Sequence, residues 1–284
     1  MVPFFSVITA TYNASGHIPT LLDSLASQTC GDFELVVQDG GSTDATLGIV
    51  ESYSGRLPAV AVMSEPDAGI YDAWNRAVAR AKGEWLVFLG ADDCFMAADT
   101  PSAVQRLLCT LPDECSFAAT SLELRGAAGF RRVLKPVMQG FGRVFSIAPA
   151  PFPSLFVRRS FAIANTFDTR YRIAGDYDFL CRTWFKANPR ELDICTVAMA
   201  LGGVSADPRN WLKSDYEMFV AARRSLPRGA PLPKGVVPAM KTCVMSSVFS
   251  VFGLRLGATV LDRIRVLRGL PPVWTEQVQP LLDE

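Results

Sequence analysis

Histidine is nearly absent from this chain of 284 residues, which contains only His17. Zinc centres built on histidine and hydrolytic triads with a histidine base both need that side chain. His17 falls within a helical pattern, where we expect a structural role. The composition therefore argues against those classes of hydrolase.

Paired cysteines and an excess of charge are also missing. The seven cysteines lie far apart and form no Cys-x-x-Cys pair, which favours reduced thiols in a cytoplasmic protein over a zinc or disulfide framework. The 28 basic and 28 acidic residues cancel, so nothing predicts a nucleic-acid partner. Any charge-driven function must be local.

Long hydrophobic runs are lacking as well. The apolar start from Val2 to Ile8 has no basic region before it, so it predicts a first buried strand and not a signal peptide. The uncharged run from Thr242 to Leu254 is shorter than the roughly 20 residues that span a bilayer. With 49% hydrophobic and 20% charged residues, the chain can bury a full core.

Short apolar runs alternate with helical patterns in the first hundred residues. The predicted helices contain Ile18 to Leu25, Asp44 to Tyr53 and Ala73 to Val78. The predicted strands are Phe5–Ala10, Glu34–Gln38, Val60–Ser64 and Trp85–Leu89. This alternation is typical of an α/β fold with a mostly parallel central sheet flanked by helices.

The pattern loosens after about Asp99. We expect a helix near Ala103–Leu111, strands at Ser116–Leu124 and Arg131–Lys135, and a Gly/Pro-rich stretch from Gly140 to Pro153. A second well-marked block runs from Ser154 to Trp184.

In open parallel sheets, ligands bind at the carboxyl ends of the strands. The first such loop contains Thr9, Ala10 and Tyr12, whose ring and polar groups are suited to stacking on and bonding a base. The second places Asp39 before two glycines. The third offers Asp67 and leads into a helix that carries Asn75. Each loop alone is equally typical of a capped turn.

The fourth loop holds the adjacent carboxylates Asp92 and Asp93 directly after an apolar strand. Two such groups repel each other unless a cation or hydrogen-bond donors compensate them. Hard divalent ions such as Mg²⁺ or Mn²⁺ take oxygen ligands and leave positions for substrate phosphates. The loop therefore predicts a metal site, with a solvated turn as the alternative.

The joint order of these segments resembles the family 2 inverting glycosyltransferases of GT-A fold, in their bacterial non-processive form. The resemblance rests on Thr11–Asn13 after the first strand, Asp39–Asp44 after the second, and Lys82–Glu84 before the strand that precedes Asp92–Asp93. It is dense over the first hundred residues and thinner to about Ser205. It implies a nucleotide-sugar donor, for which we expect a UDP-sugar, and a divalent metal.

On this resemblance, Ala10, Tyr12 and Asp39 match positions that hold the base. Asp92 and Asp93 match the acidic motif that holds ribose and metal-bound diphosphate, with Asp93 as the metal ligand. The chain has Gly90 where the commoner motif has its first acid, which leaves the metal fewer protein ligands.

The segment from Tyr171 to Arg182 resembles the family's Glu-Asp acceptor-side motif, with Gly175 in the glutamate position and Asp176 on the catalytic aspartate. That carboxylate would take the proton from an acceptor hydroxyl. Asp178 competes for this role. Arg158 and its neighbour Arg159 are either a solvated pair or cations that approach the diphosphate or the acceptor, and Arg182 at the end of the motif is a further candidate.

The C-terminal segment is apolar and basic. Between Lys234 and Arg268 there are six bases and one acid, a net charge of +5. Residues 238–270 therefore predict either peripheral contact with an anionic membrane or packing against the domain or a second chain. A glycan or lipid-linked glycan acceptor suits the first alternative, at the inner face of the cytoplasmic membrane.

We divide the chain into a nucleotide-sugar-binding half at 1–99, an acceptor-side half at 100–212 and a C-terminal helical extension at 213–284. The resemblance implies transfer with inversion, and we expect a single sugar to be transferred because the Gln-x-x-Arg-Trp motif of processive members is missing. A sugar nucleotidyltransferase and a non-catalytic nucleotide-sugar scaffold are the alternatives. The former usually has a Gly-rich basic loop after its first strand, which this chain lacks.

Overall fold

The computed structural model describes residues 2–126, 129–138, 148–202, 207–225, 237–267 and 274–275. The core of the Gly/Pro-rich stretch and the residues Gly203 to Ser205 lie outside the described residues.

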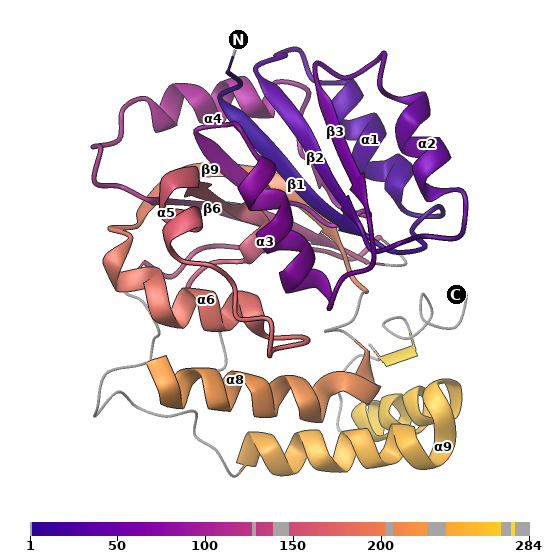
Figure 1. The fold of residues 1–284 in the computed structure, drawn as a ribbon. Helices are drawn as coiled ribbons and strands as arrows, with labels where there is room; N and C mark the ends of the chain where they lie inside the picture. Colours follow the sequence, from indigo (N-terminus) through magenta and orange to yellow (C-terminus); the bar gives the residue numbers. More distant parts are fainter. Residues whose placement is uncertain are drawn as a thin grey trace.

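Four parallel strands form the N-terminal half of the sheet, in the order β3-β2-β1-β4. They are β1 (Phe5–Thr11), β2 (Phe33–Asp39), β3 (Val60–Ser64) and β4 (Trp85–Phe88). The connecting helices are α1 (Ile18–Ala26), α2 (Thr46–Ser52) and α3 (Ile70–Arg80), as Figure 1 shows. The predicted βαβ half is confirmed.

The sheet becomes mixed beyond β4. Strand β8 (Leu155–Arg158) runs antiparallel to both β4 and β6 (Phe117–Arg125), while β6 and β9 (Arg190–Ala200) are parallel. The short β5 (Cys94–Phe95) pairs with β9, and β7 (Arg131–Leu134) pairs with β6. The predicted α/β fold class holds, but the periodicity did not identify β8 and β9, which pair only with strands remote in sequence.

Helices cover both faces of this sheet (Figure 1). One core layer joins alternate strand residues such as Ile8 and Phe88 to α3 and α6 (Gly175–Thr183). The other joins Val7 and Val87 to α1 and α4 (Thr100–Leu108). Helix α5 (Arg159–Ala164) follows β8, and short 3-10 turns occupy Phe152–Ser154, Trp184–Lys186 and Pro208–Asn210.

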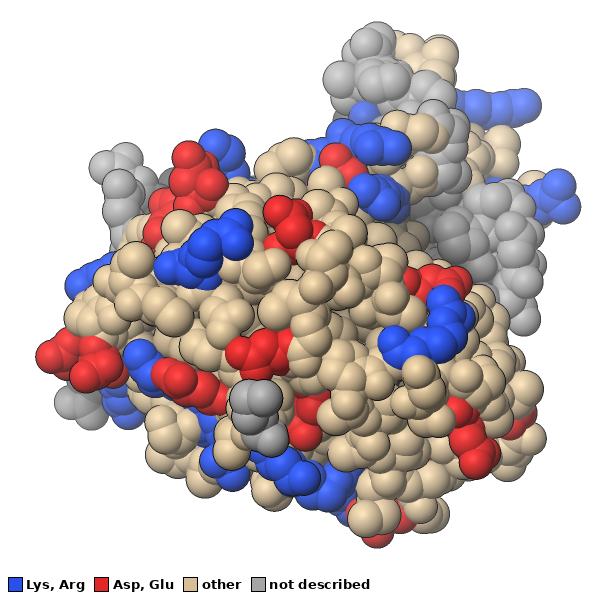
Figure 2. All heavy atoms as spheres, turned by 90° about the horizontal axis from the view of Figure 1, so that it is seen from above, with Lys and Arg blue, Asp and Glu red and all other residues tan. Residues whose placement is uncertain are grey.

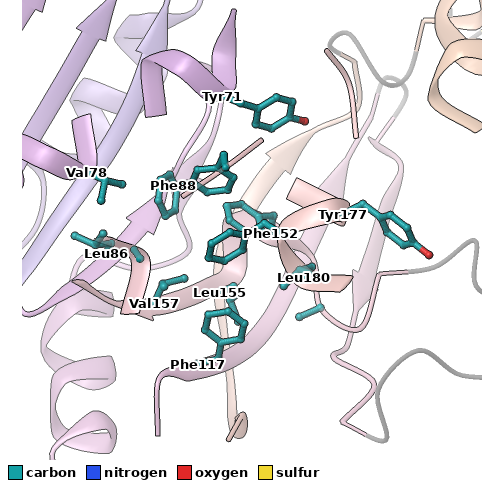
Figure 3. Packing of buried hydrophobic residues seen from close by; sticks show 14 of the residues in the cluster. Tyr71, Val78, Leu86, Phe88, Phe117, Phe152, Leu155, Val157, Tyr177 and Leu180 are labelled. Atoms are coloured by element: carbon teal, nitrogen blue, oxygen red, sulfur yellow. The ribbon is translucent and has the colours of Figure 1, made fainter. Parts of the chain in front are cut away.

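An aromatic cluster fixes α3 against α6. The rings of Trp74 and Phe152 stack at 5.4 Å between centroids, and those of Phe167 and Phe179 stack at 4.6 Å. The ring centroids of Phe88 in β4 and Phe152 lie 5.3 Å apart. Figure 3 shows both residues in the same cluster as Tyr71. Trp74 is therefore a core residue, and the ends of α3 and α6 are held at fixed positions.

Two helices follow the sheet domain: α8 (Trp211–Ser225) and α9 (Val237–Leu267). They lie side by side below it in Figure 1. Helix α9 is interrupted at Gly253, whose φ of 71° is not helical. In the described parts of the chain, none of the helices combines the length and apolar character needed to cross a bilayer.

Acidic and basic side chains are interspersed on the face seen in Figure 2, and most of that surface is uncharged. The face carries no extended field of one sign, in keeping with the balanced composition.

Gly83 allows β1 and the turn before β4 to approach closely. A Cβ there would lie 2.4 Å from both the carbonyl carbon of Phe5 and the amide nitrogen of Ser6.

We expect Gly83→Ala to lower the free energy of unfolding by about 1–3 kcal/mol or more, because the backbone of β1 cannot move aside. Urea denaturation measures this. The control is Gly48→Ala in α2, where a Cβ meets nothing within 4 Å and about 0.5–1 kcal/mol is gained. Equal stability of the two variants would contradict the close approach.

Candidate active site

The acidic loops predicted from the sequence meet at one edge of the sheet. Thr11 and Asp39 lie opposite each other in the last register position of β1 and β2, and Leu89 follows β4 beside Ile8. The loop from Gly90 to Asp93 therefore begins at the same carboxyl edge. This is the edge at which parallel α/β sheets bind ligands.

Asp39 is fully buried and organises the second loop. Its Oδ1 accepts from the hydroxyls of Thr11 (2.9 Å) and Ser42 (2.5 Å), and its Oδ2 accepts from the Ser64 hydroxyl (2.7 Å). The amides of Gly41 and Ser42 donate to Oδ2 at 3.1 and 2.8 Å. Burial opposes ionisation, but the bonds from Ser42, Ser64 and Thr11 outweigh it and hold the pKa below its usual range. Asp39 is an ionised carboxylate that many donors share.

Tyr12 stands at the mouth of this loop with 66% of its surface exposed. A Cβ on Gly40 would lie 3.5 Å from the Tyr12 ring and 2.9 Å from the Asp67 carboxylate. Glycine at position 40 therefore lets Tyr12 and Asp67 converge over the Asp39 loop. An exposed ring beside a buried carboxylate is suited to stacking on a planar base.

Asp93 has the opposite environment to Asp39. Only 3% of the residue is exposed, its Oδ2 accepts from the Gly90 amide at 2.7 Å, and its Oδ1 has no hydrogen-bond partner. Burial, reinforced by the negative charge of Asp92, raises its pKa to about 7. A divalent cation would supply what this oxygen lacks.

Gly90 packs directly against this acidic pair. A Cβ there would lie 2.8 Å from Oδ1 of Asp92 and 3.2 Å from Oδ2 of Asp93. Among the described residues, no three His, Cys, Asp or Glu side chains form a metal cluster. The residues present fit an ion that takes one or two carboxylates and keeps positions for phosphate oxygens.

Asp176 lies in the first turn of α6. It accepts from the Tyr177 amide at 2.8 Å and from the Tyr71 hydroxyl at 3.3 Å, and burial raises its pKa. The Tyr71 ring explains Gly175, because a Cβ at that position would lie 2.7 Å from ring carbons. A carboxylate with a raised pKa is suited to accepting a proton.

Three residues around Asp176 were not identified from the sequence. Tyr71 of α3 also donates to the Ile173 carbonyl at 2.6 Å. Arg172 donates to the Ala68 carbonyl, so the loop before α6 touches the Asp67 loop. Glu217 of α8 accepts from the amides of Ile173 (2.8 Å) and Ala174 (3.0 Å). No local sequence signal marks these contacts, because each joins segments more than forty residues apart.

One donor-side candidate has structural partners, and another is buried. The Asn75 side chain forms two hydrogen bonds with the backbone of Phe167. Its Nδ2 donates to the Phe167 carbonyl, and its Oδ1 accepts from the Phe167 amide, at 2.9 Å each. Thr9 is fully buried and its hydroxyl has no hydrogen-bond partner among the described residues, whereas Ala10 next to it is partly exposed. Asn75 thus clips the acceptor-side segment to α3.

The less central candidates also have structural roles. Asp178 is 2% exposed and forms an ion pair with Arg182 at 2.7 Å, which satisfies both charges inside α6. Arg158 is a correction to the sequence analysis. It pairs with Glu84 at 2.5 Å and lies over the Trp85 ring, at the start of β4. That is the opposite end of the strand from Asp92 and Asp93.

Comparison with known proteins agrees with this geometry. The family described as "Glycosyl transferase family 2" matches residues 6–121. A PGL/p-HBAD biosynthesis glycosyltransferase of Mycobacterium bovis is 37% identical over 195 residues, covering 66% of this chain and 71% of that protein. The chain belongs to glycosyl transferase family 2.

Solved structures share the fold of this family 2 glycosyltransferase. Mannosyltransferase PcManGT from Pyrobaculum calidifontis, in complex with GDP-Man and Mn²⁺, has a TM-score of 0.64 and 19% identity, over 99% of this chain and 86% of that one. S. aureus TarS in complex with UDP-GlcNAc has a TM-score of 0.61 and 22% identity, over 76% of this chain and 66% of that one. The expected GT-A fold is confirmed.

The unpartnered Asp93 carboxylate should make stability fall as pH rises. Its folded pKa of about 7 exceeds its ordinary value of 3.8, so the folded state keeps a proton that the unfolded state loses in that interval. With a chelator present, we expect wild type to lose about 2–3 kcal/mol relative to Asp93→Asn between pH 5 and pH 8. Thermal unfolding measures the difference.

Mn²⁺ should then stabilise wild type at pH 8 but not Asp93→Asn. The control is Asp113→Asn, which makes the same charge change at an exposed site. Parallel pH profiles of wild type and Asp93→Asn would show that this carboxylate is solvated and not buried.

Proposed function

We propose that this family 2 glycosyltransferase moves a single sugar from a UDP-sugar to an acceptor hydroxyl, with inversion and with a divalent metal. The observation that carries the proposal is the presence of two carboxylates that differ in their hydrogen-bond partners. Asp93 is buried with a partnerless oxygen, and Asp176 has a raised pKa at the start of α6. Donor-side and acceptor-side chemistry need these two environments.

The donor would lie along the carboxyl edge of the sheet. Tyr12 stacks on the base beside the Asp39 loop, and Asp67 closes that pocket from the third loop. Asp92 bonds the ribose, and Asp93 holds Mn²⁺ or Mg²⁺. When bound, the metal neutralises charge on the departing diphosphate. Supporting this assignment, TarS and PcManGT were solved with UDP-GlcNAc and with GDP-Man and Mn²⁺.

Asp176 would act as the general base. It takes the proton from the acceptor hydroxyl while the acceptor oxygen bonds the anomeric carbon. The bond from that carbon to the diphosphate oxygen breaks on the opposite side, so the configuration inverts and a nucleoside diphosphate leaves. The Tyr71 hydroxyl, 3.3 Å from Asp176, orients the carboxylate for this step.

Replacing the base should separate chemistry from binding. We expect Asp176→Asn to lower kcat about 10²- to 10⁴-fold, because the amide cannot accept the proton. The dissociation constant for UDP with Mn²⁺ should change less than about threefold, since Asp176 does not contact the nucleotide in this scheme. Transfer is measured with a donor panel and membrane extract as acceptor source, and binding by calorimetry.

The same assay distinguishes the alternatives. A non-catalytic scaffold would bind donor but show equal, background turnover in wild type and Asp176→Asn. A nucleotidyltransferase would release pyrophosphate from a nucleoside triphosphate and a sugar phosphate. The control is Asp113→Asn, which should retain wild-type kcat.

The C-terminal helices indicate where the acceptor is found. After Gly253, α9 exposes a stripe of apolar side chains that includes Leu256 (63% exposed), Ile264 (42%) and Leu267 (87%). Arg255 and Arg263 are exposed beside it. The acid of this segment, Asp262, is buried and accepts from the backbone of residues 274 and 275.

An outward face of apolar and basic side chains complements an anionic lipid surface. We therefore assign this face to peripheral contact with such a membrane and the acceptor to glycans or lipid-linked glycans presented there. Self-association through the same face is the competing arrangement.

Sedimentation with vesicles tests the assignment. We expect the full chain to bind vesicles containing about 30% anionic phospholipid. Arg255→Glu/Arg263→Glu should lower the affinity about 30-fold or more, since each of the two bases contributes about 1 kcal/mol near such a surface. The charge-matched control is Arg106→Glu/Arg132→Glu, at exposed positions on α4 and β7. Equal loss in both variants, or a stable dimer with no vesicle binding, would rule out the membrane assignment.

A further inference from the structure

A carboxylate from the C-terminal extension reaches the loop that carries Asp176. Glu217 lies in the middle of α8, and only 8% of the residue is exposed. Its oxygens accept from the amide of Arg172 at 3.1 Å each, from Ile173 at 2.8 Å and from Ala174 at 3.0 Å. Three consecutive backbone N–H groups therefore converge on one side chain.

These three amides immediately precede α6, whose second residue is Asp176. The first N–H groups of a helix have no partner within the helix, and a negative charge near them is favourable. Glu217 meets this requirement at Ala174, the N-cap residue of α6, from a helix more than forty residues later in the chain. The same short loop is held on its carbonyl side by Tyr71, which donates to Ile173.

Packing alone does not require a charge at this position. Ala221 and Ala222, on the same side of α8, already belong to the main core cluster. A buried carboxylate is unfavourable unless hydrogen bonds compensate it, and here the loop amides are the compensation. The carboxylate and the loop conformation thus depend on each other.

We propose that Glu217 is a positioning residue for the reaction, holding residues 172–174 so that Asp176 faces the acceptor. Helix α8 then belongs to the catalytic apparatus, although the sequence division at 212 and 213 assigned most of it to an extension. The proposal rests on the function proposed for Asp176. It concerns kcat and not donor affinity, because Glu217 contacts no residue of the donor loops directly.

The test compares Glu217→Gln with Asp215→Asn. Both remove one negative charge from α8, but Asp215 is exposed and lies two residues away. Glutamine keeps the length and one acceptor oxygen, and its NH₂ group faces amide donors. We expect Glu217→Gln to lower kcat about 10- to 100-fold and to leave the KM for donor within about twofold of wild type. The reason is that displacing a catalytic group by about 1 Å lowers the rate of a well-oriented reaction by up to about 100-fold. Glu217→Ala should lower kcat further, and Asp215→Asn should match wild type.

Hydrogen exchange of the amides of residues 172–174 provides a readout that does not need activity. These amides should exchange at least tenfold faster in Glu217→Gln, while those of β1 and β2 keep wild-type protection. Unchanged exchange, or faster exchange with unchanged kcat, would overturn the proposal. Equal loss of protection throughout the protein would show a merely structural role.

Failure of the proposed function has a different signature. If wild type transfers no sugar from any donor, the proposed role of Asp176 as general base is wrong. Exchange at residues 172–174 still decides whether Glu217 holds the loop.

Discussion

The register of three parallel strands is the constraint on which the site depends. Because β1 pairs in parallel with β2 and β4, the chain leaves all three strands at one edge. Asp39 and the Asp92–Asp93 pair, more than fifty residues apart, therefore lie at the same edge of the sheet, on either side of β1. A change in the pairing of β1 would separate the Asp39 loop from the Asp92–Asp93 loop.

Two buried carboxylates at this edge have pKa values shifted in opposite directions, because they have different numbers of hydrogen-bond donors around them. Asp39 has hydroxyl and amide donors on both oxygens and stays ionised. Asp93 has one amide donor and a neighbouring negative charge, so its pKa is raised. The first carboxylate shapes a loop, and the second keeps one oxygen without a hydrogen-bond partner.

The acceptor side is built by contacts between distant segments. Asn75 clips Phe167 to α3, Tyr71 occupies the space beside Gly175, and Glu217 gathers the amides before α6. These contacts also account for a departure from the family pattern. Gly175 stands where a glutamate is usual, and the Tyr71 ring leaves no room for a side chain there.

The sequence alone determined the α/β class, the four parallel strands and the acidic loops that follow them. It could do so because strand and helix periodicities, and the residues at strand ends, are local signals. It also placed Asp176 through resemblance. The strands β8 and β9 were not predicted, since they pair with partners remote in the chain.

Only the tertiary structure decided which polar residues share the site and which serve the scaffold. Asn75, Asp178 and Arg158 bear suitable groups, but each is already bonded within the fold. Glu217 shows the reverse, because an unremarkable glutamate in a helix became a partner of the Asp176 loop once α8 packed against α6. The sequence gives the type of each side chain, but long-range packing determines its contacts. Those contacts decide whether a charged group is already paired or can bind a ligand.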